Sequence, residues 1–457
     1  MMLRRFRGLF TAAAVCSFLL YILIFPDRLP LNILSRLLFP ISGHEIPIVS
    51  STQHLPQQER LTDLIQSLLT TFKEHEPVPT KLDVTFNVLT TSENQGDTLE
   101  AALDFKATDL MRMKQIHSSM VASLPEYPKK LFGGKGIVMV AGGRFLRIAL
   151  LSLRMLRRTG TTLPIELWMQ DESEYNAEFC DEVASSTLKV KCRLLSNYLG
   201  VDTVIGRYQL KSFAMLLSSF EQILFLDSDD FATNAINNIF DSSNFTSTGA
   251  VIWPDYWAAS ASPWLYHIIN SPQTFFKTCE TGQLLWNKKT HFGPLVLASY
   301  YNYYGPDYFY PLLSLGAAGQ GDKETFLLAC QVLNITYTFL PSPVMEIGYA
   351  DDEFHGTAMC QADPRDPDKR VHEYLFIHAH FPKVDSLELF KEGELLDGRG
   401  RRIPRFWGDR PKQLVGWDVE LAAWEEIQWI ECESSLRLED DTICRRVTDH
   451  VKWIHED

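Results

Sequence analysis

The chain has 457 residues, of which 46% are apolar and 22% are charged, a composition typical of a packed globular protein and not of a disordered one. The 43 Lys and Arg residues and 57 Asp and Glu residues give a net charge of −14, which argues against a nucleic-acid partner. The sequence contains only one long apolar run, so a membrane protein with several spans is also excluded.

The N-terminal segment predicts a membrane anchor. Leu9–Phe25 is a run of 17 residues without a charge, about 25 Å long as a helix. The alternative, a cleaved signal peptide, lacks a small-x-small cleavage site after Phe25. Basic residues precede the run, and positive flanks stay in the cytosol. We therefore expect a type II signal anchor divided into a cytosolic tail at 1–8, a transmembrane span at 9–25 and a luminal stem at 26–128.

Cysteine and asparagine patterns agree with a luminal body. Two cysteine pairs, Cys180 with Cys192 and Cys432 with Cys444, are each 12 residues apart, and they are candidate disulfides in an oxidising compartment. Spacing alone does not assign the connectivity. Asn244 and Asn334 each begin an Asn-x-Thr tripeptide, the pattern of an N-glycosylation acceptor.

The periodicity of apolar residues divides the rest of the chain. It predicts two amphipathic helices in the stem, within 61–72 and 99–120. We expect them to pack against the following domain, because no heptad pattern is sustained. From residue 129 short apolar strands alternate with helices, which indicates an α/β domain with a mostly parallel sheet over 129–390. Strands are expected at 136–140, 164–169, 222–226 and 250–253, and helices at 144–159, 175–185 and 211–220. A Trp-rich helical extension is expected at 391–457.

Two carboxylates follow one of the predicted strands. Asp227 and Asp229 come directly after the apolar segment 222–226. Ligands of open α/β sheets bind beyond the carboxyl ends of strands, and paired carboxylates suit a hard cation such as Mn²⁺ or Mg²⁺. The alternatives are a polar strand end or a cap for a helix that starts near Asn234. We interpret the pair as a metal site, because such a cation would offset the charge of a diphosphate.

A second group of polar residues lies near the end of the domain. We expect residues 373–383 to form a strand with His378 and His380 on one face. One of the two imidazoles would complete the metal site, and Lys383 would contact phosphate. The alternative is two surface histidines on an edge strand. A zinc site is less favoured, because no cysteine or third histidine is close in sequence.

Three further segments hold candidate binding residues. The small residues of 316–321 lead into a helix that opens with Asp322 and Glu324, where acids would also favour the helix dipole. A Gly-Gly pair after the first strand, with Arg144 beside it, could shape a nucleotide pocket. The segment 280–283, which includes Glu280 and Gln283, precedes an apolar strand and could bind sugar hydroxyls. The aromatic-rich run 300–310 is expected to be mostly core.

The order of these motifs resembles a known family. Strand-Asp-x-Asp, Trp-Pro-Asp at 253–255, Glu-Thr-Gly-Gln at 280–283, Tyr-Gly-Pro-Asp at 304–307, Gly-Asp-Lys-Glu-Thr-Phe at 321–326 and His-x-His-x-Pro-Lys at 378–383 are similar to motifs of the fungal Golgi α-mannosyltransferases that build α-1,2 and α-1,3 branches on cell-wall mannan. The resemblance covers roughly residues 130–390.

This resemblance implies a GT-A type nucleotide-diphospho-sugar transferase fold, GDP-mannose as donor, Mn²⁺ as metal and retention of the anomeric configuration. It implies that Asp227 and Asp229 hold the metal and diphosphate, together with His378 or His380. One position departs from the family pattern: Gln320 stands where an acid is expected. The residues expected to bind the donor are Arg144, Lys211, Asp227, Asp229, Asp255, Gln283 and Lys383, and those expected to be catalytic are Asp322, Glu324 and Glu280.

The sequence thus predicts a Golgi membrane enzyme that transfers mannose from GDP-mannose to a mannose hydroxyl of a glycan, with α-1,2 linkage favoured over α-1,3. Two alternatives stay open at this point: a transferase of the same fold that uses a UDP-sugar, and a non-catalytic glycan-binding subunit of a Golgi mannosyltransferase complex. The acceptor class and the oligomeric state, alone or with other Golgi transferases, are left open.

Overall fold

The computed structural model of the chain describes residues 55–78, 81–85, 102–103, 106–185, 187–200, 203–272, 277–317, 321–365, 374–380, 382–390, 395, 400, 402–403, 405–439 and 441–456. The predicted anchor at 9–25 and Gln320 lie outside these residues. Among the described residues, no helix has the length and apolarity needed to cross a membrane. The segment Leu55–Asp457 forms one compact unit.

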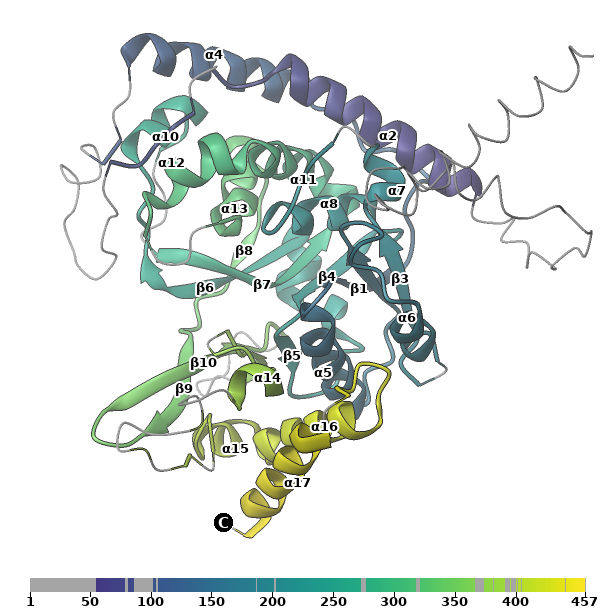
Figure 1. Cartoon of the computed structure of the whole chain (residues 1–457). Coiled ribbons are helices and arrows are strands. Elements are labelled where there is room, and N and C mark those ends of the chain that lie inside the picture. The colour runs from purple at the N-terminus through teal and green to yellow at the C-terminus, as the bar shows by residue number, and fades with distance from the viewer. Residues whose placement is uncertain are drawn as a thin grey trace, which may run out of the picture. The chain divides into compact units, whose positions relative to one another are not determined.

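The centre of this unit is a seven-stranded sheet (Figure 1) with the order β3-β2-β1-β4-β7-β6-β8. Strands β3, β2, β1 and β4 are parallel neighbours, whereas β7 is antiparallel to both β4 and β6, and β8 is parallel to β6. The sheet is therefore mixed and mostly parallel, as predicted, and it fits the GT-A type. The strands are β1 (Lys135–Val140), β2 (Ile165–Met169), β3 (Val190–Leu194), β4 (Gln222–Asp227), β6 (Ala250–Ala258), β7 (Lys277–Asn287) and β8 (Thr338–Phe339).

A second, four-stranded sheet has the order β5-β11-β10-β9 and is antiparallel throughout. Its strands are β5 (Asp230–Ala232), β9 (Met345–Ala350), β10 (Phe354–Ala362) and β11 (Tyr374–His378). The chain passes from the last residue of β4, Asp227, to the first residue of β5, Asp230, in a short turn. This turn joins the two sheets and carries the Asp-x-Asp motif.

Two strand predictions are wrong in detail. β11 ends at His378, and His380 lies in the turn that follows, so the two histidines do not share a strand face. The strand is limited by its partners, because its pairing with β5 and β10 ends at His378. Residues 280–283 do not precede a strand but lie inside β7, where Gln283 pairs with Leu226 of β4.

Helices cover both faces of the large sheet (Figure 1). On α5 the buried residues Ile148, Leu151 and Met155 recur at helical spacing, and the helix ends in Arg157 and Arg158, which suit a helix C-terminus. The helices are α2 (Leu55–Glu74), α4 (Ala107–Ala122), α5 (Phe145–Arg158), α6 (Ala177–Val183), α7 (Ser196–Leu199), α8 (Gln209–Leu217), α9 (Ser243–Thr248), α10 (Pro263–Ile269), α11 (Lys288–Tyr303), α12 (Tyr310–Ser314), α13 (Lys323–Val332), α14 (Ser386–Leu389), α15 (Arg410–Val415), α16 (Val419–Glu433) and α17 (Asp441–Glu456).

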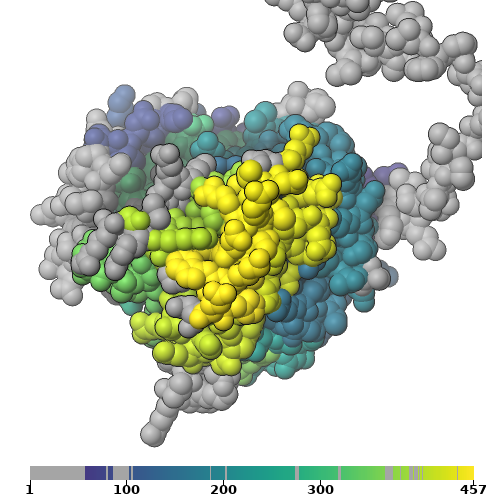
Figure 2. Space-filling view, turned by 60° about the horizontal axis from the view of Figure 1, so that its bottom comes forward, coloured from purple at the N-terminus to yellow at the C-terminus, as the bar shows by residue number. Residues whose placement is uncertain are grey.

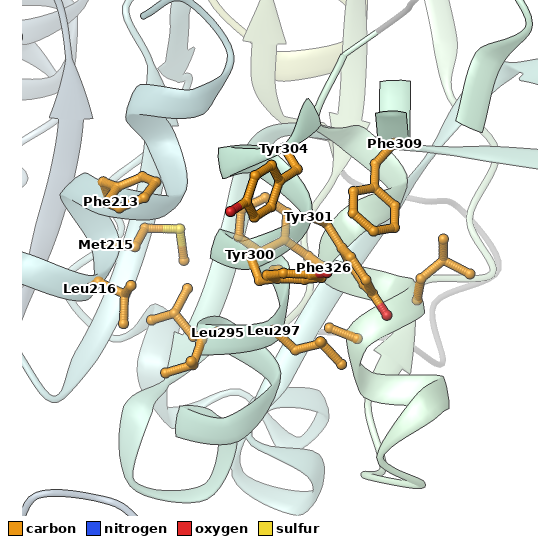
Figure 3. Packing of buried hydrophobic residues seen from close by; sticks show 14 of the residues in the cluster. Phe213, Met215, Leu216, Leu295, Leu297, Tyr300, Tyr301, Tyr304, Phe309 and Phe326 are labelled. Carbon is orange, nitrogen blue, oxygen red and sulfur yellow. The ribbon is translucent and has the colours of Figure 1, made fainter. Parts of the chain in front are cut away.

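The helices expected in the stem form part of the core. The apolar residues of α2 and α4 belong to the same buried cluster as the aromatic residues of α11, which confirms the expected packing. Figure 3 shows part of this cluster, including Tyr300 and Tyr301 of α11. Tyrosine hydroxyls fix the contact: Tyr304 donates to the Phe72 carbonyl oxygen at 3.0 Å, and Tyr300 donates to the His75 carbonyl oxygen at 2.7 Å. These bonds satisfy backbone acceptors at the C-terminus of α2, so the aromatic run 300–310 is mostly core, as predicted.

The C-terminal helices pack on the opposite side of the unit, where α16 and α17 spread over the face shown in Figure 2. α16 contacts α5 through Arg154, which pairs with Glu426 and lies 3.6 Å from the ring centroid of Trp429. Both predicted disulfides form, Cys180–Cys192 between α6 and β3, and Cys432–Cys444 between α16 and α17. The free cysteines among the described residues are Cys279, Cys330 and Cys360, and all three are buried.

Candidate active site

The candidate site lies where the two sheets meet. Asp227 ends β4, Asp229 follows two residues later, and His378 ends β11 opposite Asp230. One ligand atom from each of Asp227, Asp229 and His378 lies within 4.8 Å of the other two. The sequence predicted these two carboxylates and one of two histidines as metal ligands, and of the two histidines only His378 lies in this converging group.

The second histidine has another environment. His380 Nδ1 lies 3.2 Å from the carbonyl oxygen of His378, and His380 is not among the residues whose ligand atoms converge with Asp227 and Asp229. Burial, together with the nearby positive His378, lowers the pKa of His380. His380 therefore packs beside the converging group and does not complete it.

His378 is held between two acids. Its Nε2 is 3.4 Å from Asp229 Oδ1, and its Nδ1 is 3.5 Å from Glu280 Oε1. Gly282 makes this position possible, because a Cβ there would lie 2.7 Å from the imidazole Nδ1. Burial alone would lower the pKa of His378, but Asp229 and Glu280 raise it well above its ordinary value. The same Oε1 of Glu280 also accepts a hydrogen bond from the Gly282 amide at 2.5 Å. This bond holds the Glu280 carboxylate beside His378, where it favours the protonated imidazole.

Lysines contact both carboxylates of the Asp-x-Asp motif. Lys383 pairs with Asp229. Lys211, 6% exposed on α8, places its Nζ 3.3 Å from Asp227 Oδ2 and 3.3 Å from Asp322 Oδ2, and it donates to the Thr281 carbonyl oxygen at 2.7 Å. Burial opposes the charge of Lys211, but Asp227 and Asp322 raise its pKa above the ordinary value. Lys211 therefore links the Asp-x-Asp motif to the loop at Asp322.

The Asp322 side chain does not cap its helix. Asp322 occupies the N-cap position of α13 but makes no side-chain capping bond, and its carboxylate faces Lys211. Glu324, in the first turn, is 4% exposed, and its Oε1 has no hydrogen-bond partner among the described residues. Burial raises the pKa of Glu324 to about 7. Both acids face the protein interior, which favours a role in the site over a simple helix-dipole effect.

Lys323, between these two acids, was missed by the sequence analysis. It pairs with Asp255 of β6, and both side chains are almost fully buried. Thr278 of β7 also donates to Asp255, at 3.2 Å. The only sequence signal for Lys323 was its place in the Gly-Asp-Lys-Glu-Thr-Phe motif. Asp255 therefore contacts a lysine beside these acids, and its role in donor binding stays a prediction.

Two polar residues near the site, Gln283 and Asp230, are fully buried. Neither side chain has a hydrogen-bond partner among the described residues. Burial raises the pKa of Asp230 to about 8. Arg144 has a different partner: its side chain is 71% exposed and forms an ion pair with Glu388 at 3.2 Å. The structure thus does not bring the Arg144 side chain to the carboxylates.

The balance of charge favours a cation at this place. Electrostatic interactions connect a cluster of buried or half-buried acids consisting of Asp227, Asp229, Asp230, Asp255, Glu280, Asp322 and Glu324. Only four cationic groups among the described residues contact it: Lys211, Lys323, Lys383 and His378. Burial raises the pKa of Asp227 to about 6, although Lys211 and His378 act in the opposite direction. Two carboxylates and an imidazole are suitable ligands for Mn²⁺ or Mg²⁺, so the residues present fit the expected metal.

Known proteins place the chain in a family. The family model "Mannosyltransferase putative" matches residues 134–278 and 272–363. The chain is 31% identical to alpha-1,2-mannosyltransferase MNN21 of Candida albicans, over 78% of this chain and 67% of that protein, and 32% identical to MNN24 of the same organism, over 74% of this chain and 61% of that protein. It is also 32% identical to alpha-1,2-mannosyltransferase MNN2 of Saccharomyces cerevisiae, over 78% and 76% of the two chains.

Solved structures give only a weak likeness. The glycosyltransferase GlyE of Streptococcus pneumoniae matches with 15% identity and a TM-score of 0.30, over 46% of this chain and 45% of that chain. The galactosyltransferase LgtC matches with 11% identity and a TM-score of 0.30, over 43% and 70%. These scores are too low to bear on the site. The relatives in sequence decide the assignment: the chain belongs to the mannosyltransferase family that includes these fungal α-1,2-mannosyltransferases.

Proposed function

We propose that this protein transfers mannose from GDP-mannose to a mannose hydroxyl of a glycan, with a divalent cation and with retention of configuration. The observation that supports this most directly is the convergence of Asp227, Asp229 and His378 at the junction of the two sheets. The α-1,2 linkage is proposed from the names of the relatives. Retention comes from the family resemblance alone.

The proposed metal ligands are Asp227, Asp229 and His378. A bound Mn²⁺ or Mg²⁺ would supply positive charge to offset the diphosphate leaving group. The protein adds Lys383, which pairs with Asp229 and is half-buried, so its ammonium group is close enough to contact a phosphate oxygen. We therefore keep Lys383 as a proposed donor-binding residue. We do not keep Arg144 in that role, because its side chain pairs with Glu388 instead.

The acids have separate proposed roles. Glu280 orients His378, because it contacts the imidazole nitrogen on the side away from Asp229. Asp322 is the acid best placed to contact the reacting sugar, since Lys211 joins it to Asp227. The Glu324 carboxyl has a pKa of about 7 because it is buried, so it can hold or release a proton near neutral pH. Asp255 is proposed to hold Lys323 in the site through their ion pair. The amide nitrogen and oxygen of Gln283, which have no partner among the described residues, are proposed to bind a hydroxyl of the substrate.

We further propose that the enzyme works in the Golgi lumen, attached by the segment 9–25. The two disulfides are consistent with an oxidising compartment. Asn334, the first residue of a glycosylation tripeptide, is exposed. Fractionation of cells, with protease protection of the C-terminus in sealed vesicles, tests this proposal, and a cytosolic C-terminus would contradict it.

A donor panel tests the activity. The purified full-length protein would be incubated with mannobiose, Mn²⁺ and GDP-mannose, UDP-glucose or UDP-galactose, and the product linkage would be determined by NMR. We expect transfer from GDP-mannose alone and a new α-1,2 bond. Asp229→Asn is expected to abolish transfer while leaving the thermal unfolding transition cooperative. Transfer from a UDP-sugar would replace the proposed donor, and full metal-dependent activity of Asp229→Asn would refute the metal assignment.

A further inference from the structure

An exposed aromatic residue stands next to the candidate active site. Tyr208 immediately precedes α8, and its side chain is 52% exposed. Most tyrosines of the neighbouring segments are buried, among them Tyr310 at 5% and Tyr300 at 1%. An aromatic side chain that the core does not cover, beside a cluster of catalytic carboxylates, is available to contact a ligand.

Two residues that adjoin the Tyr208 ring have positive φ angles. Arg207, just before Tyr208, has a φ of +53°, a conformation uncommon for a residue with a side chain. Gly321, which lies against the ring, has a φ of +141°, and a Cβ there would lie 2.9–3.1 Å from three ring atoms of Tyr208. Only glycine therefore allows the ring to rest on the backbone at residue 321.

The edge of the ring is also supported. Tyr208 and Tyr310 have ring centroids 6.1 Å apart and an interplanar angle of 84°, a favourable edge-to-face arrangement. One face of the Tyr208 ring thus rests on Gly321 while the ring also meets Tyr310. About half of Tyr208 is exposed, so a flat aromatic surface with neighbours on one side faces outward.

A chain of contacts connects this ring to the diphosphate-binding residues. Lys211, three residues after Tyr208 and on the same side of α8, contacts Asp227 and Asp322 at 3.3 Å each. Asp322 directly follows Gly321, on which the ring rests. The order along the site is therefore Asp227, Lys211, Asp322, then Gly321 with the Tyr208 ring against it. A donor sugar bound between the metal site and Asp322 would place its acceptor next to the ring.

We propose that Tyr208 forms the acceptor subsite, where its exposed ring stacks on the C–H face of the acceptor mannose. This inference rests on the proposed function, because it takes the transferred sugar to lie near Asp322. Sugars present flat apolar C–H faces alongside their hydroxyls, and the amphipathic ring of tyrosine matches such a surface. Tyr208 binds and orients the acceptor in this proposal and takes no part in proton transfer.

Kinetics with three variants test the proposal. Tyr208→Ala removes the ring, Tyr208→Phe keeps it, and Phe354→Ala removes another aromatic side chain, 50% exposed on β10. We expect Tyr208→Ala to raise the KM for mannobiose by about two- to tenfold, the range that a lost aromatic contact gives. The KM for GDP-mannose should stay unchanged. Tyr208→Phe and Phe354→Ala should keep the wild-type KM for mannobiose.

Acceptor binding without donor separates this inference from the proposed function. Saturation-transfer NMR of mannobiose with the full-length protein needs no turnover, and we expect a signal with wild type that weakens with Tyr208→Ala. Loss of GDP affinity in Tyr208→Ala with unchanged acceptor KM would show that the ring serves the nucleoside and would overturn the proposal. Unchanged kinetics in Tyr208→Ala, or no saturation transfer to mannobiose with wild type, would overturn it as well. Failure of GDP-mannose as donor in the panel would instead refute the proposed function.

Discussion

Removal of residues 1–128 is expected to prevent the rest of the chain from forming a stable unit. The described part of 55–128 buries ten large apolar side chains: Leu61, Ile65, Leu68, Leu69, Phe72, Val78, Leu82, Leu103, Met113 and Met120. Burial of one such side chain contributes about 1.5–3 kcal/mol, so together they contribute roughly 15–30 kcal/mol. Part of this burial free energy comes from contacts within residues 55–128 themselves. Even half of the burial free energy is as large as the net stability of about 5–15 kcal/mol that is typical of a domain.

The truncation also uncovers polar groups. Tyr300 and Tyr304 lose their backbone acceptors on α2, and Tyr301 loses His117, whose Nε2 is 2.7 Å from the tyrosine hydroxyl. We therefore expect a fragment 129–457 to aggregate or to unfold without a cooperative transition. A fragment 55–457 should elute as a single symmetric peak in gel filtration and should unfold cooperatively in urea.

Point variants make the same comparison without truncation. Phe72→Ala should lower the free energy of unfolding by about 3–5 kcal/mol because it creates a cavity in the shared core. Glu74→Ala, two residues away on the exposed face of α2, should change it by less than about 0.5 kcal/mol. A fragment 129–457 with the same unfolding midpoint as 55–457 would refute the reasoning, since α2 and α4 would then be accessory to the fold.

Three more outcomes are expected. His378→Ala should abolish Mn²⁺-dependent transfer, whereas His380→Ala should retain it, because only His378 converges with the two carboxylates; equal losses in both variants would contradict this. Lys323→Met should destabilise the protein by about 3–5 kcal/mol in urea titrations, because it leaves Asp255 buried without its partner; a second change, Asp255→Leu, should recover part of this loss. Burial raises the pKa of Glu420 from 4.5 to about 8, so the folded state keeps a proton that the unfolded state releases between these values, and stability should fall as pH rises through this window. Glu420→Gln should reduce the difference in unfolding free energy between about pH 5 and about pH 8, and an unchanged difference would assign the pH dependence to other groups.

Local patterns made much of the fold and part of the site predictable. The apolar run before Asp227 predicts a strand, and a strand that ends in carboxylates predicts a site at the sheet edge. The twelve-residue cysteine spacings suggested both disulfides, because each pair closes a short loop. These inferences need only residues that are close in sequence.

Contacts between distant segments could not be predicted in this way. The choice between His378 and His380 depends on where β11 ends, which its pairing with β5 and β10 decides. The Lys323–Asp255 pair joins residues 68 positions apart, and it exists only because α13 packs against β7 next to β6. Arg144 was expected near the nucleotide because of its neighbours in sequence, but Glu388, from the C-terminal part of the chain, holds its side chain at the surface.

The short turn from Asp227 to Asp230 has a further consequence. It leaves one sheet and enters the other, and His378 closes the junction from the second sheet. A ligand bound by Asp227, Asp229 and His378 would therefore connect the end of a strand in the large sheet to the end of a strand in the small sheet. Since a ligand that binds only the folded state stabilises that state, amide hydrogens of β5, β10 and β11 should exchange more slowly when metal and nucleotide are present. By the same linkage, substitutions that destabilise the small sheet without touching a substrate would weaken donor binding.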